Sequence, residues 1–390
     1  MSPPPIHSHP HLSPRLLTRA PSQEMARTLQ LAPRLFHFSR DAIHALFGAL
    51  GYPERAPVWM PSFHCGMEVR AAADAGFTPY FYRVKEDLTA DEEDLAAGLG
   101  VAPGPVLLIH YFGFPQPGTA RIAALCRELR VPLVEDCSHA FLSRFERQEL
   151  GTFSPAATFS LYKTMGTVDG GALRVDEAEL CRLTGRTVAL PSAPPPPTIA
   201  WGAHWNKLQR AYRDAPVRGR AGHIQETLRA RFEARVVTAR RRIFEGEWLY
   251  GRGISRLSLG LIRRLDPEVV RERRRRNYLH LDALLRRAAG YRPVRAELPS
   301  ETCPLFLPIC VRNRTEVLLT LQAARVQAFI FGMFSHPAMD EERFPESRRL
   351  RDTILCLPVH QNLDEQDLER MASLLRPLLA AAQGSERPIL

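Results

Sequence analysis

Two segments of the chain carry residues whose types and positions could do covalent chemistry. Residues 131–134 form an apolar run that ends at Glu135 and Asp136, and residues 156–161 form a second run that leads to Lys163. An acid and a lysine at the ends of neighbouring strands are what pyridoxal 5′-phosphate (PLP) chemistry requires. The lysine forms a Schiff base with the cofactor aldehyde, and the acid keeps the pyridine nitrogen protonated so that the ring accepts electrons. We therefore interpret Lys163 and Asp136 as a candidate catalytic pair.

The elements around this pair predict an α/β fold with a mostly parallel, doubly wound sheet. Short apolar or aromatic runs predict strands at 58–61, 78–84, 106–110, 131–134, 156–161 and 172–175, and helical spacing predicts helices at 39–50, 67–75, 90–99 and 119–129. Alternation of this kind is typical of a parallel sheet wrapped by helices. Ligands of such sheets bind at the carboxyl ends of the strands, which is where Asp136 and Lys163 fall.

The chain divides into four predicted regions. Residues 1–32 are rich in Pro, His and Ser and predict a disordered lead. Residues 33–185 form the large α/β domain that would bind PLP, and residues 186–265 form a Pro-rich linker with an Arg-rich helical insertion. Residues 266–390 predict a smaller C-terminal α+β domain, with helices at 267–289, 316–325 and 364–381 and strands at 304–311, 327–330 and 355–358.

Composition favours a cytoplasmic protein. No apolar run approaches the roughly 20 residues that span a bilayer, and the N-terminus lacks the basic and apolar regions of a signal peptide. The seven cysteines form no Cys-x-x-Cys pair, which indicates reduced thiols and argues against a disulfide or zinc framework. No metal site is expected.

The net charge of +10 is concentrated in one segment. Residues 205–276 carry 20 Lys/Arg and 8 Asp/Glu, a balance of +12 that leaves the rest near neutral. The basic segment could be solvated helix faces, could attract an anionic substrate, or could contact an anionic membrane, because Phe232, Ile243 and Trp248 interleave with the arginines. No nucleic-acid module accompanies the charge, so no nucleic-acid partner is expected.

Three stretches together resemble the DegT/DnrJ/EryC1/StrS family of PLP-dependent sugar aminotransferases, which have the fold-type-I architecture. They are residues 106–113 with 134–136, residues 157–160 through Lys163 to Asp169-Gly170-Gly171, and residues 357–361 with 364–368. Each match alone is weak, but their order and spacing are specific. The resemblance runs from about residue 35 to residue 377, interrupted by the Arg-rich segment.

The resemblance implies a role for each matching residue. Lys163 would be the Schiff-base lysine and Asp136 the partner of the pyridine nitrogen. The other implied cofactor contacts are His139 at the ring hydroxyl, Ser160 at the phosphate, the helix N-terminus of Ser39, Arg40 and Asp41 at the phosphate, and Phe63 and His64 in the stretch where an aromatic residue stacks on the ring.

Two departures from the family pattern bear on these roles. The spacing from Ser160 to Lys163 is two residues shorter than is common, and Arg40 and Asp41 replace a small pair. A carboxylate beside a phosphate repels it, so we expect Asp41 to point elsewhere or Arg40 to offset its charge.

The implied activity is transfer of an amino group from an amino acid, expected to be glutamate, to a keto-sugar, expected to be nucleotide-linked, for polysaccharide or secondary-metabolite assembly. The family also implies a homodimer. One alternative is a PLP-dependent sugar dehydratase, although family dehydratases carry histidine where Lys163 stands. Another is a non-catalytic scaffold or regulatory protein on the same fold. Purely structural roles are the alternative for these residues. By that interpretation Lys163 is a surface lysine, Asp136 a helix N-cap and His110 a packed residue. For His360 and Gln361, packing and substrate contact are both open.

Overall fold

The computed structural model describes residues 3–10, 16, 18–191 and 248–383. Its main feature is a seven-stranded sheet in the order β1-β9-β8-β5-β4-β2-β3. The five strands from β8 to β3 are parallel, and β9 is antiparallel to both β8 and β1. The predicted α/β class and the mostly parallel sheet are therefore confirmed. The strands are β1 Arg34–Phe36, β2 Pro57–Pro61, β3 Thr78–Tyr82, β4 Val106–Ile109, β5 Leu133–Cys137, β8 Ala156–Ser160 and β9 Gly171–Val175.

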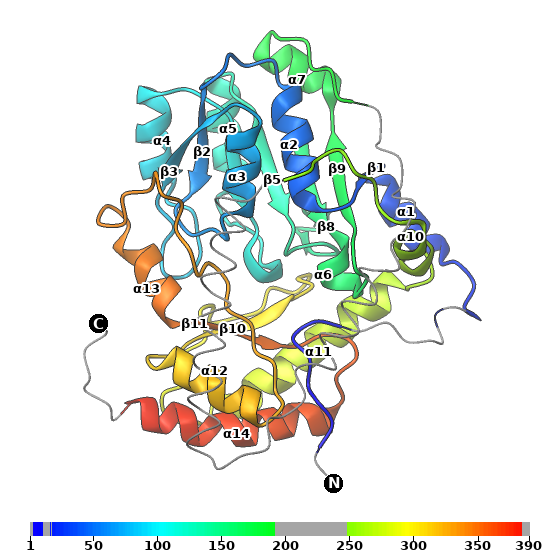
Figure 1. Cartoon of the computed structure of the whole chain (residues 1–390), viewed down its shortest axis with the longest axis vertical. Helices are drawn as coiled ribbons and strands as arrows, with labels where there is room; N and C mark the ends of the chain where they lie inside the picture. The colour runs from blue at the N-terminus through cyan, green and yellow to red at the C-terminus, as the bar shows by residue number, and fades with distance from the viewer. Residues whose placement is uncertain (1–2, 11–15, 17, 192–247, 384–390) are drawn as a thin grey trace.

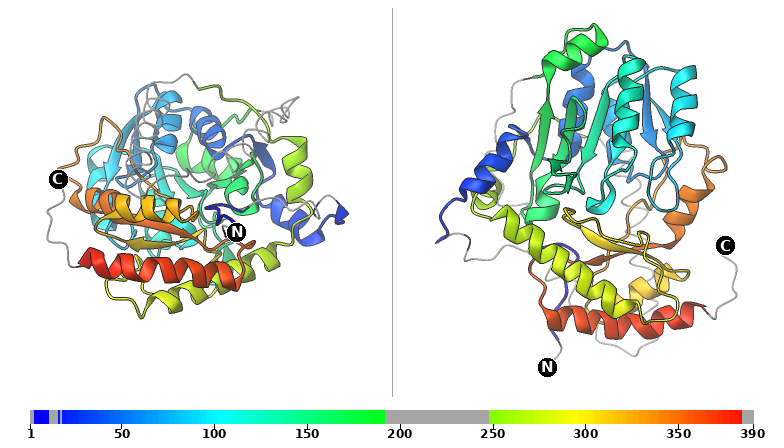
Figure 2. Two further views of the ribbon diagram at one scale, coloured as in Figure 1. Left: turned by 60° about the horizontal axis from the view of Figure 1, so that its bottom comes forward. Right: turned by 180° about the vertical axis from the view of Figure 1, so that it is seen from behind.

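Helices cover both faces of this sheet (Figures 1 and 2). They are α2 Ser39–Ala49, α3 Met67–Asp74, α4 Glu92–Val101, α5 Thr119–Glu128 and α7 Glu177–Thr184. The central strands are buried along their whole length, as in β4 and β5. This burial explains why their sequences are continuous apolar runs with no alternation.

A smaller layer packs below the carboxyl edge of the sheet (Figure 1). It contains the antiparallel pair β10 Phe306–Cys310 and β11 Ile354–Pro358, with the helices α11 Pro267–Leu285, α12 Arg314–Ala323, α13 Pro345–Thr353 and α14 Glu365–Gln383. Helix α11 begins sharply because the Asp266 side chain accepts hydrogen bonds from the Glu268 and Val269 amides and Pro267 occupies the first turn. The strand predicted at 327–330 is wrong: these residues make only one isolated bridge, Phe329 to Cys356.

The N-terminal residues differ most from expectation. Helix α1 Gln23–Gln30 is capped by Ser22, whose side chain accepts from the Met25 amide. Ile6 is 1% exposed and exchanges backbone hydrogen bonds of 2.9 Å with Arg325 and Gln327. The expectation of a disordered lead over 1–32 is therefore wrong for residues 3–10 and 18–32, because an apolar side chain anchors the first of these segments and a cap nucleates the helix.

Two short pairs complete the description. Strands β6 Arg144–Phe145 and β7 Gln148–Glu149 form a hairpin, and helices α6 Leu161–Met165 and α10 Arg256–Ile262 lie beside each other.

Among the described residues, no helix is both long and apolar enough to cross a membrane. Most of the Arg-rich insertion, including Phe232 and Ile243, lies outside the described residues.

Candidate active site

Asp136 lies at the carboxyl end of β5, beside the end of β8. The sheet register pairs Asp136 with Thr158, and the Asp136 side chain is 5% exposed. Its Oδ1 accepts the Ser138 amide at 2.8 Å and the Thr158 hydroxyl at 3.4 Å. Oδ2 makes no hydrogen bond to any described residue. The carboxylate is thus fixed through one oxygen, and the other oxygen is left to a further donor.

Lys163 lies on α6, the one-turn helix that follows β8. The sequence predicted a lysine just beyond a strand end, and the structure places a helical turn there because the strand stops at Ser160. Lys163 is half-buried. Its ammonium acts electrostatically on two neighbours. It lowers the pKa of His139, as burial does, and it lowers the pKa of Cys65, which burial raises. The structure therefore brings Lys163, Cys65 and His139 to one edge of the sheet.

His139 is buried and packed between aromatic rings. It stacks on Phe112, with ring centroids 5.3 Å apart and planes at 16°, and meets Phe331 edge-on at 4.8 Å. Burial, Lys163 and His9 together hold the pKa of His139 well below its ordinary value. His139 is thus a neutral imidazole near the lysine. Its role as a contact of the ring hydroxyl stays a prediction.

The start of α2 lies against the same edge. Ser39 is buried, and its Oγ lies 2.7 Å from the Ser138 Oγ, which links the helix to the loop that holds Asp136. Gly171 permits this approach, because a Cβ there would fall 2.2 Å from the Phe38 carbonyl carbon and 2.5 Å from the Ser39 nitrogen. Ser160 lies opposite Gly171 in the register. Its buried Oγ has no hydrogen-bond partner among the described residues.

The Asp41 carboxylate folds back onto the start of its own helix, where a backbone amide occupies one of its oxygens. Its Oδ2 accepts the Phe38 amide at 3.0 Å, which caps the helix. Burial raises the pKa of Asp41, and Arg40 opposes that effect. The Arg40 guanidinium lies between the rings of Phe38 and Trp248, 4.5 and 4.4 Å from their centroids. Only the amide groups of this turn and Ser39 thus remain suited to bind a phosphate.

The stretch at 61–65 turns its side chains in different directions. Phe63 packs on Tyr111 and Phe331, and His64 stacks on Phe81. The pKa of His64 is held well below its ordinary value by burial, Arg351 and His336. His64 therefore faces the small layer. The role of His64 as a cofactor contact stays a prediction.

Cys65 is the residue of this stretch whose pKa the Lys163 ammonium lowers against the effect of burial. Sequence reasoning missed Cys65 and its partner Glu68. Glu68 is buried in the first turn of α3 and accepts the Cys65 amide at 2.9 Å and the Cys65 thiol at 2.8 Å. Burial and Asp136 raise the pKa of Glu68, and burial and Glu68 raise that of Cys65. The signal available in the sequence was a glutamate at the start of a helix, three residues after Cys65.

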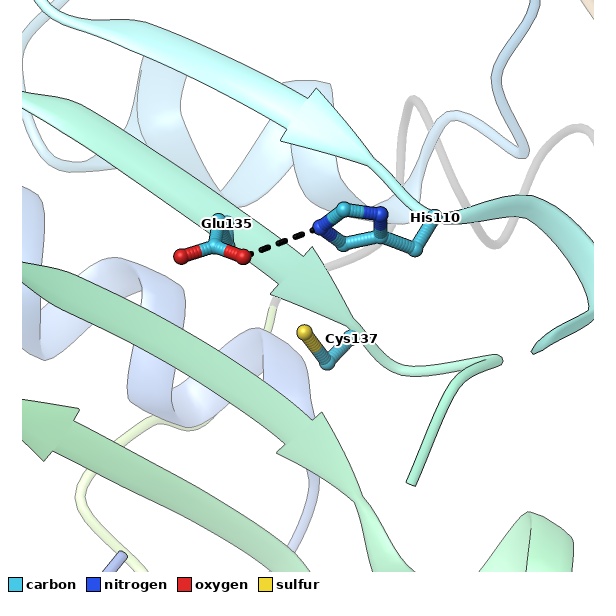
Figure 3. Close-up of side chains that lie close together, drawn as sticks. All are labelled: His110, Glu135 and Cys137. Atoms are coloured by element: carbon cyan, nitrogen blue, oxygen red, sulfur yellow. Dashed lines mark hydrogen bonds and ion pairs between the residues drawn. The ribbon is translucent and has the colours of Figure 1, made fainter. Parts of the chain in front are cut away.

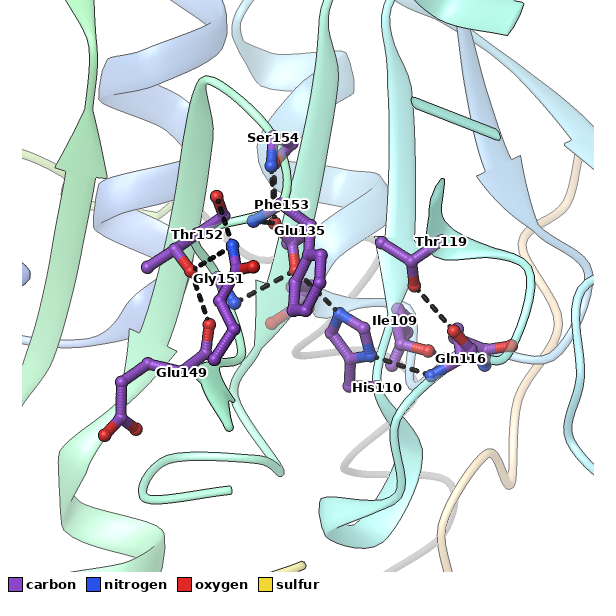
Figure 4. A network of polar contacts seen from close by, with 12 residues as sticks. Ile109, His110, Gln116, Thr119, Glu135, Glu149, Gly151, Thr152, Phe153 and Ser154 are labelled. Atoms are coloured by element: carbon purple, nitrogen blue, oxygen red, sulfur yellow. Dashed lines mark hydrogen bonds and ion pairs between the residues drawn. The ribbon is translucent and has the colours of Figure 1, made fainter. Parts of the chain in front are cut away.

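Glu135, the neighbour of Asp136, belongs to a different network on the other face of the strand (Figures 3 and 4). Its carboxylate accepts the amides of Gly151, Phe153 and Ser154 and the Ser154 hydroxyl, each at 2.9 Å. It also accepts His110 Nε2 at 3.0 Å. Because His110 Nδ1 accepts the Gln116 amide at 3.1 Å, the proton of this imidazole lies on Nε2.

This arrangement argues against a metal ion at the cluster of His110, Glu135 and Cys137 (Figure 3). All three side chains are buried. Hydrogen bonds already use both oxygens of Glu135, and burial, Glu135 and Asp136 raise the pKa of the Cys137 thiol well above its ordinary value. A metal needs a thiolate and free lone pairs. We therefore interpret the cluster as a packed structural network that fixes β4 against β5. This interpretation agrees with the alternative that His110 is a packed residue.

With this geometry in view, comparison with known proteins shows which family the chain resembles. Residues 39–185 match the model of the DegT/DnrJ/EryC1/StrS aminotransferase family. This matched segment is less than half of the chain. It contains Asp136, Lys163 and every other residue to which the sequence assigned a cofactor contact.

Relatives and solved structures agree with this assignment. The dTDP-4-dehydro-2,3,6-trideoxy-D-glucose 4-aminotransferase of Saccharopolyspora spinosa is 33% identical over 181 residues, which are 45% of this chain and 46% of that protein. The chain thus spans less than half the length of the curated relatives that it matches. The aminotransferase TlmJ of Streptoalloteichus hindustanus, 22% identical, superposes with a TM-score of 0.66 over 96% of this chain and 99% of that one. A Streptococcus pneumoniae protein solved in its PLP form, 12% identical, gives 0.68 over 98% and 100%. The fold is that of the fold-type-I aminotransferases.

The residues present fit a PLP molecule. Three observations on this chain carry that conclusion: the unpartnered Oδ2 of Asp136, the orphaned buried Oγ of Ser160, and the lysine that faces the same edge. A buried polar atom without a partner is uncommon. One such buried atom, Ser160 Oγ, and one unpaired carboxylate oxygen, Asp136 Oδ2, lie at the ends of adjacent strands beside a helix N-terminus. They match a ligand that carries a phosphate and a ring N–H.

Proposed function

We propose that this protein is a PLP-dependent aminotransferase that transfers an amino group from an amino acid, expected to be glutamate, to a keto-sugar. The observation that carries the proposal is the pairing of Asp136, with its free oxygen, and Lys163 at neighbouring strand ends of a family segment. The likeness of that segment to a dTDP-sugar aminotransferase supports a nucleotide-linked sugar in polysaccharide or secondary-metabolite biosynthesis.

The cofactor would be held by side chains from four elements. Lys163 would bind it covalently through its amine, Asp136 would accept the pyridine N–H, and Ser39, Ser160 and the first amides of α2 would contact its phosphate. When bound, PLP supplies an electron-withdrawing ring that makes the proton on the donor's α-carbon acidic. His139 and Cys65 would border the ring as neutral groups.

The reaction then depends on proton movement by one lysine. Displaced by the donor's amine, the Lys163 amine can accept the proton from the donor α-carbon, and it can return a proton to the sugar carbon that gains nitrogen. The hydrogen bonds from Ser138 and Thr158 hold the Asp136 carboxyl group in place, where a negative charge would favour the positive charge on the ring nitrogen. A lysine at this position weighs against the dehydratase alternative.

The test of this function uses purified protein and PLP. A bound cofactor should give a visible absorption band that changes on addition of glutamate. Borohydride reduction should attach the cofactor to Lys163, identified by peptide mass spectrometry. Lys163→Ala should lose both signals, whereas the exposed Lys85→Ala should keep them. A protein that takes up no PLP would contradict the proposal and favour the scaffold alternative. Incubation with candidate nucleotide-linked keto-sugars, followed by mass spectrometry, then identifies the acceptor.

Three further statements belong to the same proposal. We infer a homodimer and a cytoplasmic location from the family resemblance, and a boundary between the large domain and the C-terminal domain near residue 266. Any contact of the Arg-rich insertion with an anionic membrane falls largely outside the described residues. Sedimentation with and without anionic vesicles, and sedimentation velocity for the oligomeric state, test the two partner proposals.

A further inference from the structure

The helix that carries Lys163 is very short. Helix α6 is one turn, Leu161–Met165, between β8 and Gly166. Gly166 ends it with φ of 80°, and its amide donates to the Tyr162 carbonyl at 2.9 Å. A Cβ at Gly166 would lie 2.7 Å from the Pro10 carbonyl oxygen, so only glycine fits. Isolated turns of this length are marginal, and their last carbonyls lack partners.

The Thr164 carbonyl, next to Lys163, receives two donors from the opposite layer. Arg274 on α11 donates through Nη2 at 2.9 Å, and Gln361, three residues after β11 ends, donates through Nε2 at 3.0 Å. Neither the Arg274 guanidinium nor the Gln361 amide hydrogen-bonds to a described strand of the seven-stranded sheet. The turn that carries the lysine is therefore held from outside the domain that it belongs to.

Arg274 commits its whole guanidinium to hydrogen bonds, one of which holds the turn. Its side chain is 0% exposed. Its Nε donates to Gln361 Oε1 at 2.9 Å, and Nη1 donates to the Pro304 and Leu305 carbonyls at 3.2 and 3.3 Å. No carboxylate of a described residue pairs with it. Burial lowers the pKa of Arg274 to about 10, so the group stays charged at neutral pH. A cation facing carbonyls at the end of a helix is favourable.

We propose that Arg274, with Gln361, is a positioning residue that clamps the Thr164 carbonyl and so fixes the Lys163 amine relative to Asp136. A rigid guanidinium fork suits several fixed acceptors, which a lysine would not reach together. The proposal rests on the proposed role of Lys163, but the state of α6 can be measured without a cofactor.

The experiment uses the full chain with Lys85→Arg and Lys207→Arg, which leaves Lys163 as its only lysine. In this background we compare Arg274→Lys, Arg274→Gln and Gln361→Leu. The matched control is Arg275→Lys: Arg275 is the next residue on α11 and donates to the Pro299 and Thr302 carbonyls, but not to α6. Two readouts are taken: hydrogen exchange of the 161–166 amides without cofactor, and the rate at which PLP with borohydride labels Lys163.

The clamp predicts a specific pattern. Exchange of 161–166 should be about tenfold faster in the Arg274 variants, while 133–137 stays protected as in the parent. PLP labelling should slow roughly 10- to 100-fold, whereas acetylation of Lys163 by acetic anhydride, which needs no fixed position, should change less than about twofold. Gln361→Leu should show the same effects more weakly, and Arg275→Lys none.

The outcomes separate the clamp from the proposed function. Folded Arg274 variants with parental exchange at 161–166 overturn the clamp. Faster exchange with unchanged PLP labelling also overturns it as a positioning device. If the parent chain takes up no PLP, the proposed function fails and the exchange data alone decide whether the clamp exists. Should Arg274→Gln not fold, Arg274→Lys and Gln361→Leu give the same readouts.

Discussion

Replacing Glu135 by glutamine tests whether the buried network beside the site is structural. Five hydrogen bonds end on the two oxygens of Glu135: Oε1 accepts from the amides of Phe153 and Ser154 and from the Ser154 hydroxyl, and Oε2 accepts from the Gly151 amide and His110. A glutamine keeps one acceptor oxygen and turns an NH2 group toward the donors that faced the other. The change removes a charge and introduces a donor–donor conflict without changing volume.

The size of the effect follows from which bonds survive. The better orientation keeps the three bonds on the Oε1 side and loses those from Gly151 and His110. His110 cannot adapt by moving its proton to Nδ1, because that nitrogen accepts the Gln116 amide. Two bonds to a charged acceptor contribute ~1.5–3 kcal/mol each. Since a neutral side chain is easier to bury, the net loss in the free energy of unfolding should be ~3 kcal/mol. For a chain of this size that is a fall in melting temperature of ~4 °C.

The assay is thermal and urea unfolding of Glu135→Gln beside Glu128→Gln. Glu128 lies exposed on α5 and has no hydrogen bond to a described residue, so its variant should match the parent. A loss below ~1 kcal/mol at Glu135 would refute the argument from five satisfied acceptors. So would a clear rise in the parent's melting temperature on adding Zn²⁺ that disappears in Glu135→Gln, because it would show lone pairs available to a metal.

Three other perturbations test separate parts of the structure. His64→Phe should raise stability by ~1 kcal/mol at pH 7, because both ring nitrogens of His64 are buried without partners among the described residues. Its lowered folded pKa means that only the unfolded chain gains a proton near pH 6.5, so the parent loses stability below that pH and the variant should lose less. PLP uptake by His64→Phe should be unchanged, and a fall in uptake would restore His64 as a cofactor contact. Burial raises the pKa of Asp169, but the nearby His37 and Ser258 and the Ser255 hydroxyl, which donates to Oδ1 at 3.0 Å, outweigh burial and hold the pKa below its ordinary value. Stability from Asp169 is therefore complete above about pH 4 and lost as pH falls through the folded pKa, and Asp169→Asn should flatten that acid limb in urea unfolding between pH 5 and pH 2. Ile6→Ala should cost ~2–4 kcal/mol in the same assay, while exposed Pro5→Ala should cost little; equal values would mean that the N-terminal segment adds no stability.

Much of the fold could be predicted from the sequence because its signals are local. The central strands β2, β4, β5 and β8 are runs of four or five residues, nearly all of them buried, and the helices between them have apolar positions at helical spacing. Helix α13 escaped prediction because it is strongly polar, with Ser347, Leu350 and Arg351 as its buried residues. The segment 327–330 was predicted as a strand from its apolar character, but it pairs at one residue only and its burial comes from packing.

The N-terminal segment shows a different limit. Its composition resembles that of disordered chains, and nothing in it has a period. Its order comes from contacts distant in sequence: Ile6 pairs beside Val326, the His360 ring lies 3.0 Å from the His7 carbonyl, and His9 packs edge-on against Phe306. Composition describes how much surface a segment can bury by itself, and it says little about a surface that another part of the chain provides.

For the site, residue type and chain order predicted which segments meet, but not which side chain of each segment points inward. In the stretch at 61–65 the aromatic residues were the natural choices for a ring contact, yet Phe63 and His64 are directed into the packing and Cys65 is directed at the lysine. A strand end followed by a turn does not keep the alternation of the strand, so direction there depends on what each side chain can pack against. Glu68 decides it: its carboxyl binds both the amide and the thiol of Cys65 and thereby turns that residue inward. The same pairing occurs at Asp41, whose carboxylate accepts the Phe38 amide at the start of α2. In both places the carboxylate lies three residues after the residue whose amide it accepts. An acid at this spacing at the start of a helix is therefore a usable sequence signal for a side chain that is held by the backbone of its own turn.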